Sequence, residues 1–147
     1  MKIAIGCDHG AYELKEIFKK HFDGKGIEYE DCGTYSLDSV NYPIYAKAVC
    51  KAVQNKKADF GILLCSTGIG MSIAANKFKG IRAALCGDTY SAKFTRLHNN
   101  SNVLCIGALV TGVGLAKEIA DIFLSTEFEG GRHATRVDMI TEIENEQ

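Results

Sequence analysis

Apolar residues follow two alternating patterns along this chain. Short continuous apolar runs with the length of buried strands occur at residues 2–7, 27–32, 59–65, 81–86 and 102–107. Between these runs, apolar residues recur every three or four positions, which is typical of helices with one buried face. This period predicts helices over residues 11–22, 44–54, 71–77, 89–99, 114–124 and 132–144.

The same spacing indicates which residues of each helix face inward. These are Leu14, Ile17, Phe18 and Phe22 in the first helix, Tyr45, Ala48, Val49 and Ala52 in the second, Leu115, Ile119, Ile122 and Phe123 in the fifth, and Val137, Ile140 and Ile143 in the last. The segment 33–43 contains the single proline, Pro43, and is expected to be a loop.

Apolar strands that alternate with helices predict an α/β fold. We expect a three-layer α/β/α, Rossmann-like arrangement, in which helices cover both faces of a five-stranded parallel sheet. The length of 147 residues fits a single domain over residues 1–147. Parallel sheets bind ligands beyond the carboxyl ends of their strands, so the residues that follow each strand are the candidates for a site.

Charge and cysteine content narrow the possible partners and location. The net charge of −1 argues against nucleic acid or an anionic membrane as the main partner, because both attract basic surfaces. No apolar stretch approaches the ~20 residues of a membrane helix, and the first residues do not resemble a secretory signal. The six cysteines form no C-x-x-C pair. We therefore expect a reduced, cytoplasmic protein without disulfides.

The motif "CSTGIG" (65–70) ends the third predicted strand and opens a helix. Glycines let a backbone approach a ligand closely, and the free N–H groups that open a helix can bind an anion. A thiol at such a position favours the thiolate form. The alternative is that Cys65 is simply a core residue, because Cys86 and Cys105 also lie at or near strand ends.

A dinucleotide fingerprint is a second interpretation of the same motif. Gly68 and Gly70 match the first two glycines of G-x-G-x-x-G, and Asp88 follows at a suitable distance. Ile73, however, occupies the place of the third glycine, and the motif lies in the third strand–helix unit rather than the first.

Asp8 and His9 follow the first predicted strand. Their side chains can hydrogen-bond sugar hydroxyls or a phosphate, although Asp8 is equally suited to cap the next helix. A metal site at this pair is disfavoured, because no third ligand lies at a suitable spacing.

Four further residues could contribute to a site. His98 is a candidate acid–base group, or a cation that complements a helix C-terminus. Asn99 is a candidate hydrogen-bond donor or a turn residue. Arg132 and Arg136 are four residues apart, so they would share a helix face that suits a phosphate, unless they are only solvated surface charges.

Four segments together resemble the type B ribose-5-phosphate isomerases: "GCDHGAYELK", "CSTGIGMSIAANKFKGIRAALC", "HNNSNVLCIGA" and "EFEGGRHATRV". They occur in the same order and cover essentially the whole chain. The superfamily also includes isomerases of galactose 6-phosphate and allose 6-phosphate. The resemblance implies reversible isomerisation of ribose 5-phosphate to ribulose 5-phosphate through an enediolate, without a metal or a cofactor.

The resemblance also implies catalytic roles. Cys65 stands at the position of the thiolate base, and Met71 replaces the glutamate base that other members carry six positions later. His98, with Asp8, would assist ring opening, and Thr67 would relay a proton. Ser66 departs from the glycine that usually follows the cysteine in the thiol-dependent members.

The implied substrate-binding residues include the donors of the 66–70 segment and a phosphate group of Arg132, Arg136 and His9. Tyr42 would close over the sugar, and Asn99 would donate to the enediolate or a hydroxyl. The full set is Asp8, His9, Tyr42, Ser66, Thr67, Gly68, Ile69, Gly70, Asn99, Arg132 and Arg136.

The family implies a homodimer or tetramer in which two chains share each site. The C-terminal helix is expected to make the dimer contact. An isomerase of a hexose 6-phosphate remains open, because the 33–43 loop would set the depth of the pocket. A nucleotide-binding regulatory module with the same architecture is a third possibility, but it gives His98, Arg132 and Arg136 no role.

Overall fold

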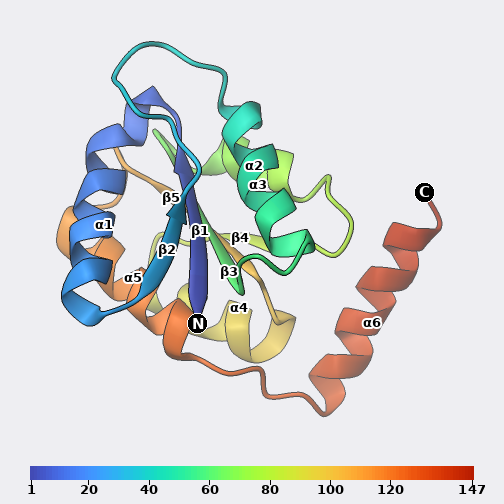
Figure 1. Ribbon diagram of the computed structural model, residues 1–147. Coiled ribbons are helices and arrows are strands. Elements are labelled where there is room, and N and C mark those ends of the chain that lie inside the picture. Colours follow the sequence, from blue (N-terminus) through green and yellow to red (C-terminus); the bar gives the residue numbers. More distant parts are fainter.

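The computed structural model describes all 147 residues and has a single parallel sheet (Figure 1). Its strands are β1 (Lys2–Cys7), β2 (Glu28–Asp31), β3 (Phe60–Cys65), β4 (Ala83–Leu85) and β5 (Val103–Gly107). Their order across the sheet is β2-β1-β3-β5-β4, and all neighbours are parallel. The predicted α/β class and the five-stranded parallel sheet are confirmed.

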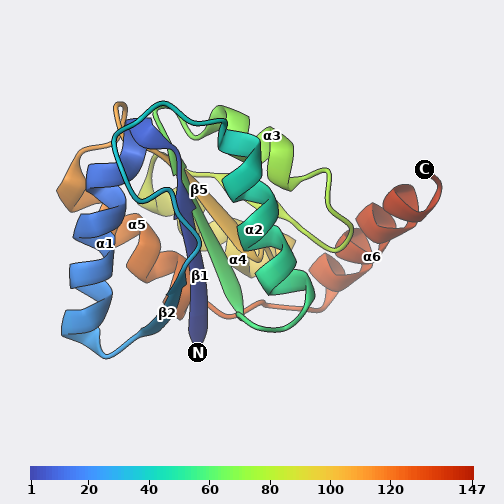
Figure 2. The same ribbon diagram turned by 45° about the horizontal axis from the view of Figure 1, so that its top comes forward.

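Helices cover both faces of this sheet (Figure 2). A short 3₁₀ turn, η1 (His9–Ala11), precedes the first helix, and the helices are α1 (Tyr12–Lys25), α2 (Tyr42–Gln54), α3 (Ile69–Ala75), α4 (Thr89–Asn99), α5 (Val113–Ser125) and α6 (Arg132–Asn145). One core contains α1, α4 and α5, and the other contains α2 and α3. Residues such as Ile5 and Ala4 of β1 contribute to opposite cores, because successive strand residues point to opposite faces.

The register aligns the carboxyl ends of the three central strands. Cys7 of β1 pairs with Leu64 of β3, and Cys65 pairs with Gly107 of β5. The residues that follow β1, β3 and β5 therefore meet at one edge of the sheet. This is the edge at which the sequence predicts the site.

Some helix faces differ from those predicted. In α2, Ala46 and Cys50 are buried while Ala48 is exposed, and in α5 Ala116 and Ala120 are buried while Leu115 is 40% exposed. Small residues allow these helices to lie close to the sheet, so they take positions that a pattern based on side-chain size assigns to larger neighbours.

Two predicted boundaries also differ. Pro43 lies in the first turn of α2 rather than in the preceding loop. The first turn tolerates proline, because its N–H would have no partner within the helix. The fourth strand is limited to Ala83–Leu85, at the edge of the sheet.

Helix α6 extends away from the rest of the chain (Figures 1 and 2). Its only buried residues are His133 and Val137, near its start. Ile140 and Ile143, which the sequence pattern places on the same stripe as Val137, are 47% and 57% exposed. The apolar stripe predicted for the last helix therefore exists, but most of it has no partner within the chain.

None of the helices combines the length and the apolar character needed to cross a membrane.

A buried lysine connects α1 to the segment that follows β2. Lys15 is fully buried, and its Nζ donates to Oδ1 of Asp31 at 2.6 Å and to the main-chain oxygen of Thr34 at 2.5 Å. Burial opposes ionisation of Asp31, but hydrogen bonds from Lys15, Gly33 and Lys19 outweigh it and lower the pKa of this carboxyl group. The sequence pattern did not predict this pair, because lysine is usually exposed and Asp31 lies 16 residues further along the chain.

We expect Lys15→Ala to lower the free energy of unfolding by about 3 kcal/mol, because it leaves buried polar groups without their cation. Lys20→Ala, an exposed residue of the same helix, should change it by no more than about 0.5 kcal/mol. Urea unfolding at neutral pH measures both.

The difference between Lys15→Ala and wild type should shrink as the pH falls below about 4, because the lowered pKa of Asp31 makes its contribution present above the ordinary aspartate pKa and lost on acidification. Equal stability of Lys15→Ala and Lys20→Ala at neutral pH would contradict this role.

Candidate active site

Cys65 is the last residue of β3, and its sulfur faces the loop that follows. The main-chain N–H of Gly68 donates to Sγ at 3.1 Å, so the thiol acts as an acceptor. In contrast, the thiols of Cys32 and Cys50 donate to main-chain carbonyl groups. Burial is the main cause that raises the pKa of Cys32 to about 11 and that of Cys50 to about 12. The thiol of Cys65 thus differs from these two thiols in accepting a hydrogen bond from the main chain.

Gly68 gives the loop after Cys65 its shape. Its φ of +77° lies in the left-handed region, and an added Cβ would lie 2.5 Å from Leu85 Cδ1 and 2.9 Å from the carbonyl carbon of Ile106. Only glycine fits this position without strain. The close packing of the loop on β4 and β5 holds the Gly68 N–H directed at the sulfur.

The loop leads directly into α3, whose first N–H groups have no helical partner. Thr67 is exposed, and its Oγ1 accepts a hydrogen bond from the N–H of Ile69 at 3.3 Å. Met71 is fully buried in the core, so it cannot face a substrate. The loop thus offers Ser66, Thr67 and main-chain donors around Cys65, as the sequence predicts.

Tyr42 reaches the same loop from the start of α2. An added Cβ on Gly70 would lie 2.8 Å from Cζ of Tyr42, so this aromatic ring packs directly against the Gly70 backbone. Tyr42 is 39% exposed, which leaves part of the ring open to a ligand.

The side chains of Asp8 and Ser66 both lie beside Gly10. An added Cβ on Gly10 would lie 2.4 Å from Oγ of Ser66 and 3.3 Å from Oδ1 of Asp8. Asp8 caps η1, because Oδ1 accepts from the N–H of Gly10 at 3.0 Å. The capping interpretation of Asp8 is therefore correct, and the same side chain lies beside the loop of Cys65.

His9 is oriented by the segment before α2. The N–H of Val40 donates to its Nδ1 at 3.1 Å. An accepting Nδ1 in a neutral ring leaves the proton on Nε2, which can donate to a ligand.

The other predicted site residues lie elsewhere in the chain. His98 and Asn99 end α4, and Arg132 and Arg136 are in the first turns of α6. Both arginines are exposed and neither forms an ion pair. They are available for an anionic ligand, but not beside Cys65.

The topology separates these residues from Cys65. Helix α4 returns the chain to the edge where strands begin: Asn102, three residues beyond Asn99, accepts a hydrogen bond from the N–H of Gly61 near the start of β3. Cys65 lies at the other end of β3, and a six-residue strand spans about 20 Å. One chain therefore carries a carboxyl-edge group (residues 8–9, 42 and 65–70) and an amino-edge group (residues 98–99, 132 and 136).

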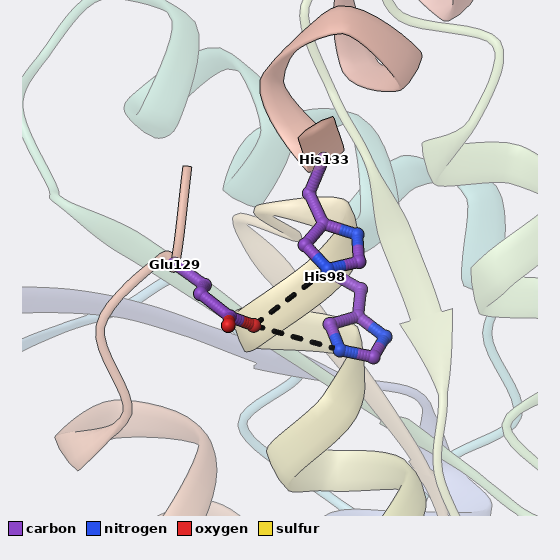
Figure 3. A group of neighbouring side chains, drawn as sticks. All are labelled: His98, Glu129 and His133. Carbon is purple, nitrogen blue, oxygen red and sulfur yellow. Dashed lines mark ion pairs between the residues drawn. The ribbon is translucent and has the colours of Figure 1, made fainter. Parts of the chain in front are cut away.

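His98 of the amino-edge group also belongs to a cluster with Glu129 and His133 that the sequence patterns did not indicate (Figure 3). The rings of His98 and His133 stack with centroids 4.0 Å apart, and Oε2 of Glu129 lies 3.7 Å from Nε2 of His98 and 3.6 Å from Nε2 of His133. Burial, His98 and the neighbouring arginines lower the pKa of His133, whereas Glu129 opposes this shift. The i,i+4 spacing of Glu129 and His133 was the only sequence signal available.

Asp88 does not support the dinucleotide interpretation. It caps α4, and its two carboxylate oxygens accept from the N–H and the hydroxyl group of Ser91 at 2.6 and 2.8 Å. Ile73 is 58% exposed, so the position of the third glycine does not form the close helix–strand contact that such a motif requires.

Known proteins with this fold are similar in sequence to this chain along nearly its whole length. Ribose-5-phosphate isomerase B of Escherichia coli (strain K12) is 50% identical over 143 residues, which are 97% of this chain and 96% of that protein. The ribose-5-phosphate isomerase B structure of Clostridium thermocellum is 49% identical with a TM-score of 0.98, and each chain is 99% covered. The Mycoplasma genitalium enzyme, solved with bound ribulose-5-phosphate, is 39% identical with a TM-score of 0.94, and the match covers 99% of this chain and 97% of that chain.

Such similarity over the whole chain, with an exposed arginine pair and a hydrogen-bonded thiol, defines the class of this protein: an isomerase that interconverts aldose and ketose sugar phosphates. The chain belongs to the Ribose/Galactose Isomerase family, whose model matches residues 3–140.

Gly68→Ala should lower kcat/KM by about 10²-fold, because the displaced loop would no longer direct its N–H at the sulfur. It should also lower the free energy of unfolding by about 1–3 kcal/mol, because alanine is strained at this φ. Gly87→Ala is the matched control, since its added Cβ would meet nothing within 4 Å. Activity and urea unfolding measure both variants; a Gly68→Ala enzyme that behaves like Gly87→Ala would contradict the role of the loop.

Proposed function

We propose that this isomerase interconverts ribose 5-phosphate and ribulose 5-phosphate through an enediolate, with the Cys65 thiolate as the base and without a metal. The observation that carries this proposal is the hydrogen bond from the Gly68 N–H to Sγ of Cys65 at the ligand-binding edge of the sheet. The ribulose-5-phosphate complex of the Mycoplasma genitalium relative supports a pentose phosphate as the substrate.

The chemistry follows from the carboxyl-edge group. The thiolate removes the proton from C2 of the open-chain aldose, and the electron pair of that bond forms the C1–C2 double bond of the enediolate. The resulting thiol returns the proton to C1, while Thr67 moves a proton between O1 and O2. Main-chain donors of the 66–70 loop stabilise the enediolate, and one such donor is typically worth about 3 kcal/mol.

Ring opening precedes this step and requires a proton at the ring oxygen. His98 supplies it, and Asp8 acts with it on the sugar hydroxyl. An imidazole can both donate and accept a proton, which suits this transfer. Because one chain keeps His98 and Asp8 at opposite edges of its sheet, the two must come from different chains.

We therefore infer that the protein is a homodimer whose sites are shared. Each site combines the carboxyl-edge group of one chain with the amino-edge group of the other. The exposed Ile140 and Ile143 of α6 line a cavity of about 420 Å³ between α6 and the amino edge of the sheet, and burial of this surface would stabilise the pair. A tetramer would be a pair of such dimers.

The phosphate binds between the two chains. Arg132 and Arg136 of one chain present guanidinium groups, and Nε2 of His9 of the other chain donates a hydrogen bond. This remote contact places C2 near the sulfur and contributes binding energy to the reaction. Asn99 and Tyr42 complete the enclosure of the sugar.

Two other functions are compatible with the same architecture. The family includes galactose isomerases, so a hexose 6-phosphate is the second candidate, and a panel of sugar phosphates decides between them. A nucleotide-binding module would use no arginine pair, and Asp88 is engaged as a cap.

We propose a single domain that acts in the cytoplasm, where its six free thiols stay reduced.

Isomerisation of ribose 5-phosphate in deuterated water tests the reaction. We expect NMR to show deuterium on the sugar carbons with wild type, because the carbon-bound proton passes through an exchangeable thiol. Cys65→Ala should show neither turnover nor deuterium, while Cys32→Ala, a variant of a thiol outside the site, should match wild type. Near-normal turnover by folded Cys65→Ala would show that the base is another group.

Arg136→Ala should raise KM for ribose 5-phosphate by more than about tenfold with a smaller change in kcat, because it removes a charged phosphate contact. Lys20→Ala, an exposed cation on α1, should leave both unchanged.

Mixing Cys65→Ala chains with Arg136→Ala chains tests whether two chains share a site. Random exchange produces one intact site in each mixed dimer, so activity at low substrate should recover to about a quarter of wild type. Mixtures in which chains exchange without recovery would show that both groups act within one chain.

A further inference from the structure

The cluster of His98, Glu129 and His133 contains two residues that the proposed reaction does not use. His133 is only 4% exposed, and its Nε2 has no hydrogen-bond partner. A buried ring nitrogen without a partner normally carries an energetic cost. In this protein that nitrogen faces the carboxylate of Glu129 (Figure 3).

The separations within the cluster exceed those of hydrogen bonds and approach those of metal ligands. Oε2 of Glu129 is 3.6 Å from Nε2 of His133 and 3.7 Å from Nε2 of His98, and the three ligand atoms lie within 4.8 Å of one another. Two ligands that each lie ~2.0–2.1 Å from one tetrahedral Zn²⁺ are roughly 3.4 Å apart. The separations from Glu129 to the two nitrogen atoms are thus close to those between ligands of one such ion.

The side chains differ in their freedom to move. His133 is fixed by burial, whereas the side chains of His98 and Glu129 are 36% and 56% exposed. The two rings are nearly parallel, with 9° between their planes, so His98 must turn its ring for both nitrogens to converge on one ion. Arg132 and Arg136 oppose a cation, but they are exposed and solvent screens their charge.

We propose that His98, Glu129 and His133 form a binding site for one divalent transition-metal ion of the Zn²⁺ type. Two imidazoles and one carboxylate suit Zn²⁺ or Co²⁺, whereas Mg²⁺ and Ca²⁺ prefer oxygen ligands only. A water molecule would be the fourth ligand.

Metal binding would inhibit the enzyme, a consequence that rests on the proposed function. The ion takes Nε2 of His98, so this ring can no longer transfer a proton during ring opening. The site therefore links isomerase activity to the free concentration of zinc.

Co²⁺ binding to the full chain tests the site without any assay of catalysis. The experiment uses Cys65→Ser protein, so that the thiol of the loop does not contribute, and follows Co²⁺ by visible absorption and equilibrium dialysis. We expect about one ion per chain, and an affinity at least tenfold lower in the additional variant Glu129→Gln. Glu127→Gln, an exposed carboxylate two residues away, is the matched control and should bind like the parent.

Equal affinity in the Glu129→Gln and Glu127→Gln proteins would overturn the site, as would an intense near-ultraviolet band from a thiolate ligand that persists in both. His133→Asn provides a second variant, checked for folding by circular dichroism, and should also lose the ion. If Co²⁺ binds as expected but Zn²⁺ does not inhibit isomerisation by the otherwise wild-type enzyme, the site stands and the role of His98 in ring opening is wrong.

Discussion

The polarity of the parallel sheet is the constraint on which the rest of this structure depends. Each strand ends at one edge, and the helix that follows must return the chain to the opposite edge before the next strand begins. Residues at strand ends and residues at helix ends are therefore kept apart. In this chain Cys65 is a strand-end residue and His98 is a helix-end residue, so the two lie at opposite edges of the sheet.

In the proposed mechanism, this separation explains why a site needs residues from two chains. The carboxyl-edge group contains the sulfur and the main-chain donors of the 66–70 loop, but it contains no arginine. The amino-edge group contains two arginines without an ion pair and an imidazole, but no thiol. In the proposed dimer, a second copy attached through the exposed stripe of α6 would supply each group with the other.

The two groups also differ in how firmly they are held. Gly68 and Gly70 are enclosed by Leu85 and Tyr42, so the loop that faces the sulfur has little freedom. The arginines and the ring of His98 are exposed in the single chain. His133, which stacks on His98, is buried beside this group, and its Nε2 has no hydrogen-bond partner.

The sequence by itself determined the α/β class, the five strands, most helix boundaries and the residues around Cys65, because these depend on local periodicity and on residues adjacent to one strand end. The buried Lys15–Asp31 pair, the exposure of Ala48 and Leu115, the partition of the site residues into two groups and the His98–Glu129–His133 cluster depend on contacts between distant segments. Tertiary structure alone decided these features, because a one-dimensional pattern records which residues could form a site but not which edge of the sheet each of them reaches.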